Sequence, residues 1–230
     1  MRELKNFYFL AFFFELRENV GMKIYNFELG PIGVNCFLII PESGGAVMID
    51  APEGSFETTK KILDKSGLKV EALLLTHGHW DHIWDAKKFQ DAGAKIYAHP
   101  DGASFIENTN SQSAYLYGME GLESAKIDVK LYDGQILKFS DAEFEVRVTP
   151  GHCAGSVSYI LKSQGLAFVG DLIFAGSIGR YDLPTGNFAL LEKSIKEKIY
   201  TLPDSTKLLC GHGEFTSVGE EKSSNPFVRA

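Results

Sequence analysis

The chain has 230 residues and a formal net charge of −7. Hydrophobic residues make up 44% and charged residues 23%, which excludes collagen-like, disordered and disulfide-scaffold proteins and favours one soluble globular domain. The acidic balance also argues against a nucleic-acid partner, because proteins that bind phosphate backbones usually carry a basic surface.

The first 21 residues are predicted to be an N-terminal extension, and residues 22–230 a single domain. The extension contains the apolar run FYFLAFFF at residues 7–14, which is shorter than the roughly 18–20 residues that cross a membrane. A signal peptide is disfavoured because acidic residues follow the run where a cleavage site should be. We therefore expect no membrane partner and interpret the extension as an extra strand, a short helix or a dimer contact. The expected state is a monomer or a homodimer.

The first half of the domain alternates short strands and helices. Strands are predicted at 23–29, 34–40, 46–49, 70–75 and 95–98, where apolar or alternating runs are bounded by glycine and proline. Helices are predicted from Ser55 to about Gly67 and from about His82 to Asp91. Residues 100–125 are polar and are expected to form short surface helices.

The second half has the same character. Strands are predicted at 129–132, 143–149, 156–161, 166–169 and 207–210, and a helix at 188–199. The pair Gln164-Gly165 predicts a hairpin between two of the strands. Two sheets packed face to face with helices outside satisfy this order, but periodicity alone does not separate that α/β arrangement from an ordinary three-layer sheet.

Five of the six histidines lie in three short glycine-rich loops, each following an apolar strand. A fourth strand, LAFVGD, ends in the same way at an aspartate. Histidine and carboxylate side chains at neighbouring strand ends are suitable ligands for Zn²⁺, Fe²⁺ or Mn²⁺. The sequence therefore predicts a metal site, with candidate ligands His77, His79, Asp81 and His82 in THGHWDH, His152 in TPGHCAGS, Asp171 in LAFVGD, and His212 in CGHGE.

The remaining residues of this chemical type are predicted to be structural. His99 has no such neighbours. Cys36 lies in an apolar strand, and Cys153 and Cys210 adjoin ligand histidines whose nitrogens and neighbouring carboxylates already suffice for two metals. An odd number of widely spaced cysteines indicates reduced thiols and a cytoplasmic location.

With THGHWDH and the later GH, GD and GHG loops, the sequence resembles the metallo-β-lactamase superfamily over nearly its whole length. The resemblance implies an αββα four-layer sandwich with the metals at one edge of the two sheets. Two further stretches, GDLIFAGSIGRYDLPTG at 170–186 and GHGEFTSVGEEKSSNPFVR at 211–229, are similar to glyoxalase II.

Glyoxalase II resemblance implies two divalent ions, zinc first, with iron or manganese as alternatives. It assigns His77, His79 and His152 to the first ion and Asp81, His82 and His212 to the second, with Asp171 bridging them. The implied reaction is hydrolysis of a small-molecule thioester such as S-lactoylglutathione by a metal-activated hydroxide, with Asp81 and Asp171 also as catalytic residues.

Three further residues are candidates for substrate binding: Tyr181 beside the Asp171 loop, and Lys222 and Arg229 as the basic residues of the C-terminal tail. Arg180 and Asp182 are expected to pair and brace their loop. The departure from longer glyoxalase II chains is that this one ends at Ala230, without the helices that supply basic contacts to glutathione.

Three other activities use related ligand sets. A persulfide dioxygenase would hold one non-heme iron, and metallo-nucleases and lactonases belong to the same superfamily. The stretch GSIGRYDLP favours the hydrolase, and the acidic charge disfavours the nuclease.

Overall fold

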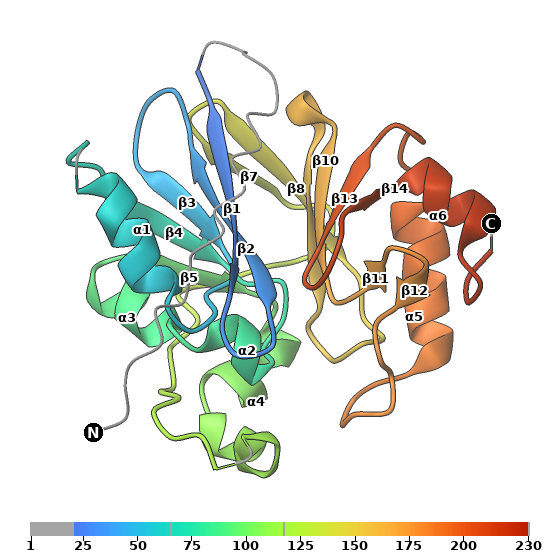
Figure 1. Cartoon of the computed structure of the whole chain (residues 1–230), viewed down its shortest axis with the longest axis horizontal. Helices are drawn as coiled ribbons and strands as arrows, with labels where there is room; N and C mark the ends of the chain where they lie inside the picture. The colour runs from blue at the N-terminus through green and yellow to red at the C-terminus, as the bar shows by residue number, and fades with distance from the viewer. Residues whose placement is uncertain (1–20, 65, 117, 230) are drawn as a thin grey trace, which may run out of the picture.

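Two six-stranded sheets lie face to face, with helices covering both outer surfaces (Figure 1). The computed structural model describes residues 21–64, 66–116 and 118–229. Residues 1–20 of the predicted extension lie outside this range, so the extension and the domain boundary stay predictions.

The first sheet has the strand order β1-β2-β3-β4-β5-β6 and comes from the first half of the chain. Strands β1 to β3 are antiparallel, and β3 to β6 are parallel. Its strands are β1 (Lys23–Leu29), β2 (Val34–Ile40), β3 (Ala46–Ile49), β4 (Val70–Leu74), β5 (Lys95–Ala98) and β6 (Val129–Lys130).

The second sheet has the order β14-β13-β10-β9-β8-β7, and only its β10–β13 pair is parallel. Its strands are β7 (Ile136–Phe139), β8 (Ala142–Val148), β9 (Val157–Leu161), β10 (Leu166–Gly170), β13 (Lys207–Cys210) and β14 (Thr216–Ser217). A separate small hairpin, β11 (Ile173–Phe174) and β12 (Ser177–Ile178), follows β10.

Side-chain alternation along the strands produces the layers. On β2, Phe37 and Ile39 face the core between the sheets, whereas Cys36 and Leu38 face the outer core under the helices. On β10, Phe168 points into the inner core and Val169 into the outer core of the second sheet. Strands buried on both faces explain the continuous apolar runs in the sequence.

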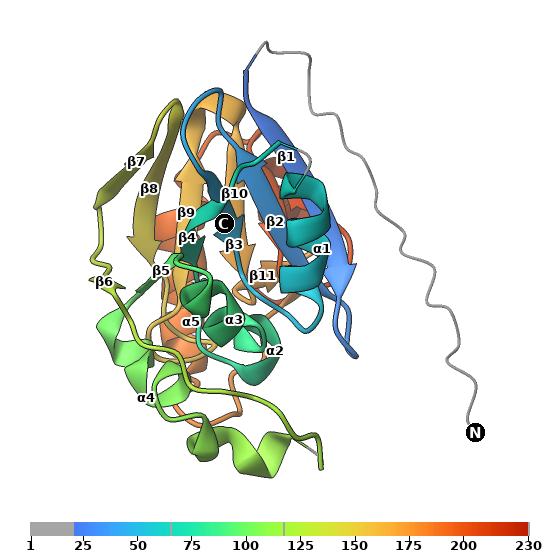
Figure 2. The ribbon, with the colours of Figure 1, turned by 90° about the vertical axis from the view of Figure 1, so that its left-hand side faces the viewer.

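The helices bury the apolar outer faces of the two sheets (Figure 2). Helices α1 and α3 pack on the first sheet, and α5 with α6 on the second. The helices are α1 (Ser55–Leu63), α2 (Trp80–Ile83), α3 (Ala86–Asp91), α4 (Ala103–Ile106), α5 (Phe188–Ser194, extended by a π-turn over Ile195–Ile199) and α6 (Val218–Ser224), with 3₁₀ turns at Pro100–Gly102, Thr109–Tyr115 and Lys162–Gln164. None of the helices in the described ranges is long and apolar enough to cross a membrane.

The αββα sandwich is therefore confirmed, and so is the hairpin at Gln164-Gly165. The predicted helix from His82 to Asp91 is wrong in one respect, because it is divided into α2 and α3. Main-chain groups between them bond to Ala51 instead of continuing the helix: Ala51 N–H donates to His82 O, and Asp85 N–H donates to Ala51 O. The predicted strand at 129–132 is shorter, and β7, β11, β12, β14 and α6 were not predicted.

Candidate metal centre

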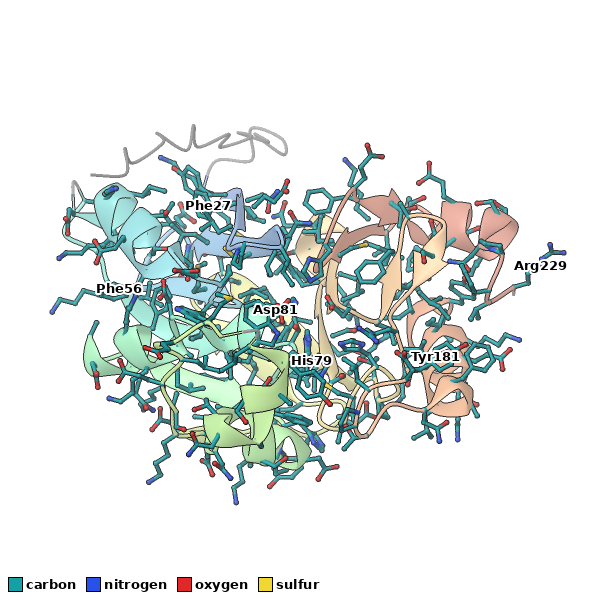
Figure 3. The ribbon with its side chains drawn as sticks, turned by 60° about the horizontal axis from the view of Figure 1, so that its bottom comes forward. Phe27, Phe56, His79, Asp81, Tyr181 and Arg229 are labelled. Atoms are coloured by element: carbon teal, nitrogen blue, oxygen red, sulfur yellow. The ribbon has the colours of Figure 1, made fainter. Side chains whose placement is uncertain are left out.

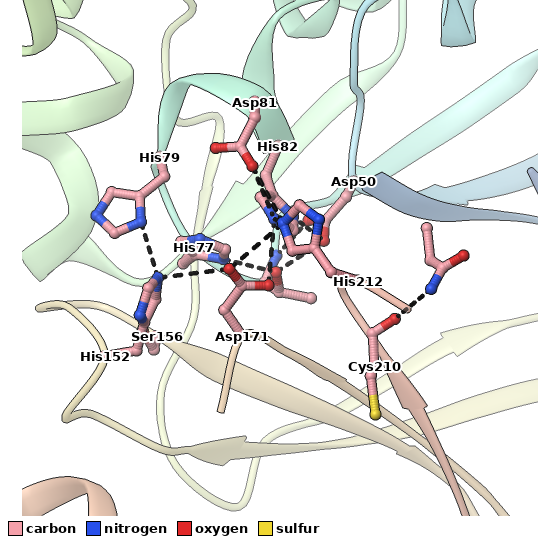
Figure 4. Close-up of polar contacts among 12 residues, drawn as sticks. Asp50, His77, His79, Asp81, His82, His152, Ser156, Asp171, Cys210 and His212 are labelled. Atoms are coloured by element: carbon pink, nitrogen blue, oxygen red, sulfur yellow. Dashed lines mark hydrogen bonds and ion pairs between the residues drawn. The ribbon is translucent and has the colours of Figure 1, made fainter. Parts of the chain in front are cut away.

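The seven predicted ligands meet at one edge of the sandwich, where four strands end (Figure 4). The loop after β4 and helix α2 supply four of them from the first sheet. Loops after β8, β10 and β13 supply one each from the second sheet. The structure brings together all seven: His77, His79, Asp81, His82, His152, Asp171 and His212.

Three imidazoles form the first donor set, which we call set 1: His77, His79 and His152. One nitrogen of each lies within 4.8 Å of the others. His79 Nδ1 is 2.8 Å from His152 Nε2. This trio is the one that sequence reasoning assigned to the first ion.

The second donor set, set 2, consists of Asp81, His82 and His212. Asp81 Oδ2 lies 3.2 Å from His212 Nε2, which lies 3.4 Å from His82 Nε2. Asp171 stands between the two sets: its Oδ1 is 3.3 Å from His82 Nε2, and its Oδ2 is 3.7 Å from His152 Nε2. A carboxylate in this position can bridge two cations.

The hydrogen bonds of His152 and His212 use one ring nitrogen of each and leave the other available to bind a metal. The Nδ1–H groups of His152 and His212 donate to the carbonyls of Arg180 (2.8 Å) and Gly33 (3.1 Å), so their Nε2 atoms are free to accept. His77 Nε2 and Asp171 Oδ1 are buried and make no hydrogen bond within the part of the chain that the structure describes. Buried polar atoms without partners are costly. The donor set therefore fits divalent cations, which would satisfy these orphaned atoms.

Burial sets the charge state of His77 and His79 in set 1. It lowers the pKa of His77 well below its usual value, and it lowers that of His79 to about 4, with help from neighbouring His152. Both rings are consequently neutral at pH 7, as metal ligands must be. Burial also opposes a charge on His82, but Asp171, Asp81 and Asp50 together outweigh it and raise the pKa of His82. A cation at set 2 would displace that proton.

Asp50 and Thr76 are parts of the centre that sequence reasoning missed. The Asp50 carboxylate is 2% exposed and accepts from Thr76 N–H (2.8 Å), Thr76 Oγ1 (2.7 Å) and His82 Nδ1 (2.9 Å). Thr76 Oγ1 also contacts His77 Nδ1 at 3.0 Å. Asp50 thus orients one histidine directly and another through Thr76. The signal in the sequence is an aspartate directly after an apolar strand. In the structure, Asp50 has a positive φ of 57°.

Two buried amide side chains hold the loops of the centre. Asn35 Nδ2 donates to the carbonyls of Cys210 (3.0 Å) and Gly213 (2.9 Å), on either side of His212. Gln112 Nε2 donates to Gly78 O at 2.9 Å, between His77 and His79. Sequence reasoning did not assign either residue, because each acts on a loop far away in the chain.

The glycine at position 211 is required by the close approach of the strand end to the ligands. A Cβ atom there would overlap Asp171 Oδ1 and crowd the His82 ring. Any larger residue would displace the bridging carboxylate.

The centre opens into a cavity of about 370 Å³. Besides ligands, its walls are formed mainly by apolar and aromatic side chains from four regions of the chain. Among the described lining residues, Arg180 is the one arginine and there is no lysine. Four of the lining residues come from the segment 100–125, which was predicted only to cover a surface: Phe105, Gln112, Tyr115 and Met119. The apolar and aromatic lining residues include Ile32, Trp80, Phe105, Tyr115, Met119, Leu183 and Pro184.

The three residues predicted to bind substrate are not brought together here. The Tyr181 ring packs on Phe188, with centroids 5.1 Å apart, beside the cavity-lining Arg180. Lys222, on α6, forms an ion pair with Asp204 (2.7 Å), and Arg229 lies at the right-hand edge of the molecule in Figure 3, away from His79 and Asp81. Neither Lys222 nor Arg229 is among the described residues that line the cavity.

Other predictions for single residues can be compared with the structure. Arg180 and Asp182 form the predicted pair, with two N–H···O contacts of 2.8 and 3.0 Å. His99 lies outside both donor sets, and its Nδ1 accepts from Asp101 N–H to cap a 3₁₀ turn. The structural interpretation of His99 agrees with this contact.

The three cysteines are free and buried, and we expect their thiols to be inert in the folded protein. Burial raises the pKa of Cys153 to about 11 and raises those of Cys36 and Cys210 as well. At pH 8 only about 0.1% of the Cys153 thiol is then the reactive thiolate. Titration with a chromogenic disulfide should count no fast thiols in the native protein and three after unfolding without reductant. A count of one after unfolding would contradict this, since it requires a disulfide.

Comparison with known proteins identifies the family. The family model described as "Metallo-beta-lactamase superfamily" matches residues 29–212, a range that contains all seven clustered ligands. The chain belongs to the metallo-β-lactamase superfamily. Among curated relatives in the superfamily, one from Haemophilus influenzae named hydroxyacylglutathione hydrolase GloC is 34% identical, over 89% of this chain and 99% of its own. A Bacillus subtilis relative named probable metallo-hydrolase YqgX is 35% identical over 90% of this chain and 98% of its own.

Solved structures of the superfamily agree with the fold. The BLEG-1 B3 metallo-β-lactamase is 35% identical with a TM-score of 0.82, covering 90% of this chain and 100% of that one. TTHA1623, described in a di-iron-bound form, is 32% identical with a TM-score of 0.77, covering 88% and 99%. ETHE1 from Myxococcus xanthus is 27% identical with a TM-score of 0.70, covering 84% and 78%. The chain is accordingly a metallo-hydrolase of this superfamily.

Proposed function

We propose that the protein is a glyoxalase II-like thioesterase that hydrolyses S-2-hydroxyacylglutathione, such as S-lactoylglutathione, with two divalent ions at sets 1 and 2. The observation that carries the proposal is the pair of adjacent three-residue donor sets with Asp171 between them. The relative named hydroxyacylglutathione hydrolase supports the choice of substrate. Zinc is proposed first, although the di-iron form of TTHA1623 makes iron a direct alternative.

Two ions held in these sets would supply Lewis acidity and would lower the pKa of water at the centre. The protein's own part is to hold the donors rigidly and to exclude bulk water. We assign this role to all seven ligands, with Asp171 and Asp81 as the catalytic carboxylates nearest the reacting atoms. Asp81 is 7% exposed and Asp171 is almost buried, so both act in a region of low dielectric constant, where their charges count for more than in water.

The cavity supports a small thioester as partner. Its apolar walls suit the thiol and acyl chains of such a substrate, and the one arginine among its described lining residues, Arg180, is paired with Asp182. Tyr181 remains a proposed substrate contact because its loop adjoins the cavity. Lys222 and Arg229 are not proposed for this role, since neither lines the cavity. A net charge of −7 supports the absence of a nucleic-acid partner, and free cysteines support a cytoplasmic location.

The proposal is tested by assaying one preparation against competing substrates. Protein loaded separately with zinc and with iron(II) is given S-D-lactoylglutathione, glutathione persulfide with oxygen monitoring, and a chromogenic β-lactam. We expect thiol release from the thioester by the dinuclear protein and no activity in a His77→Ala variant. The control separates catalysis at the centre from a contaminating esterase.

A persulfide dioxygenase is the second candidate, favoured by the similarity to ETHE1. Oxygen uptake with the persulfide in the iron form, without thioester cleavage in either form, would select it. Cleavage of the β-lactam alone would instead point to the activity named for BLEG-1.

A further inference from the structure

The small hairpin β11–β12 begins and ends at the candidate metal centre. It leaves the centre directly after Asp171 and returns at Gly179 and Arg180, where Gly179 N–H donates to Leu172 O at 3.2 Å. The returning strand lies against the departing one so closely that a Cβ on Gly179 would collide with the Asp171 carbonyl. Since Arg180 O accepts from His152 Nδ1 at 2.8 Å, the hairpin determines the position of two ligands at once.

The hairpin cannot hold this position by its own hydrogen bonds. Its ladder has two residue pairs, Ile173–Ile178 and Phe174–Ser177. A two-stranded hairpin is marginally stable in isolation, and one with so short a ladder needs external contacts. The Phe174 ring also lies 6.3 Å from the His212 ring, so movement of the hairpin would reach set 2 as well.

Two buried polar side chains of the C-terminal segment form hydrogen bonds to the turn of the hairpin. Glu221, 2% exposed, accepts from the Gly176 N–H at 3.1 Å. Asn225, fully buried, donates from Nδ2 to Ser177 O at 3.0 Å and to Glu221 Oε2 at 2.7 Å. Both contacts are to main-chain atoms of the turn, so they fix its backbone rather than one side chain.

Burying the Glu221 carboxylate costs more desolvation free energy than an apolar side chain would, so stability alone does not explain it. Glu221 is a buried carboxylate whose described partners are Thr216 Oγ1 (2.6 Å), Gly176 N–H and the Asn225 amide, none of which carries a positive charge. Apolar side chains of similar volume would fill the same space without the desolvation cost of a carboxylate. What apolar side chains cannot do is hold the N–H and C=O of a turn at fixed positions.

We propose that Glu221 and Asn225 are positioning residues for the metal centre, acting through the β11–β12 hairpin on Asp171 and His152. Among the described residues, none of the hydrogen-bond partners of their side chains is a ligand. The inference gives the EEKSSNPF segment a role in metal binding, and it rests on the proposed metal centre but not on the identity of the substrate.

The test compares Asn225→Ala with Tyr200→Phe. Tyr200 OH donates to Glu221 O (3.1 Å) and Val228 O (2.7 Å), so its removal loosens the same C-terminal segment without touching the hairpin. Zinc dissociation constants are measured by competition with a chromophoric chelator. Amide hydrogen exchange of residues 172–180 is followed in the metal-free protein.

We expect Asn225→Ala to weaken zinc binding about tenfold to a hundredfold, the usual effect of losing an outer partner of a ligand. Exchange of residues 172–180 should become faster in the same variant. Tyr200→Phe should lower the melting temperature and change neither quantity. If Asn225→Ala does not fold, Glu221→Gln replaces it, with a smaller loss of affinity because the amide oxygen can keep one bond.

Equal weakening of zinc binding by Asn225→Ala and Tyr200→Phe would overturn the inference, because the segment would then be merely structural. Unchanged zinc affinity in Asn225→Ala would overturn it too. Neither readout depends on thioester cleavage. Failure of the proposed substrate would therefore leave this result intact, and failure of this inference would leave the substrate assay unaffected.

Discussion

Asp171→Asn is expected to lower kcat/KM for the thioester by about 10²-fold to 10³-fold, the scale seen when a principal electrostatic contact in an active site is removed. The physical reason is its position: one oxygen lies 3.3 Å from His82 Nε2 of set 2, and the other 3.7 Å from His152 Nε2 of set 1. A neutral amide keeps the shape but presents one weak acceptor instead of two charged oxygens. Metal analysis should show fewer than two ions per chain, and steady-state kinetics should show the loss mainly in kcat.

Asp204→Asn provides the matched control. It makes the same chemical change at an exposed aspartate that pairs with Lys222 on the outer face of the second sheet. Its metal content and kinetics should equal those of the wild type. An Asp171→Asn protein that keeps two ions and most of its activity would remove Asp171 from the catalytic assignment.

Asp50→Asn is expected to weaken metal binding at set 2 about tenfold to a hundredfold and to reduce the free energy of unfolding by about 1–3 kcal/mol. Three donors converge on this carboxylate, from Thr76 N–H, Thr76 Oγ1 and His82 Nδ1. The single oxygen of an amide at this position can accept from fewer of these donors. Its NH₂ group would then face one of the remaining donors, with which it cannot form a hydrogen bond. Metal titration and denaturant unfolding of the metal-free protein measure the two effects separately.

The same substitution at a second buried aspartate distinguishes an effect on the metal ligands from the general effect of altering a buried carboxylate. Asp85 is fully buried, accepts from Phe56 N–H at the start of α1 and pairs with Lys88, without contacting any ligand. Asp85→Asn should destabilise the fold and leave metal affinity unchanged. Equal loss of metal affinity in both variants would show that Asp50 acts only through stability.

The ligands could be predicted from the sequence because their signal is local. Histidines in THGHWDH, GHC and GHG each follow an apolar strand, and strand ends of a sheet meet at one edge. The sandwich itself needed the resemblance to known families, since alternating strands and helices are compatible with more than one layering. The split between α2 and α3 could not be predicted, because it depends on main-chain bonds to Ala51 that only the folded arrangement of β3 and α2 brings together.

The supporting residues lacked a local signal for the same reason. Asp50 and Thr76 are 26 residues apart in the sequence and meet because β3 and β4 pair in parallel and end together. Asn35 reaches the His212 loop across 175 residues. Lys222 shows the converse limit: its charge suggested a substrate contact, whereas the structure places it on α6, paired with Asp204, and α6 was not predicted from the sequence.

The division of ligands between the sheets has a consequence for folding. Each donor set takes two side chains from the segment formed by the loop after β4 and helix α2, and one from the other half of the chain. A bound ion is therefore a cross-link between two segments that are remote in sequence, comparable to a disulfide that closes a long loop. At a free metal concentration of 100 times the dissociation constant, such a ligand adds about 2.7 kcal/mol to the free energy of unfolding per site. Metal starvation of the cell would then reduce the amount of folded protein as well as its activity.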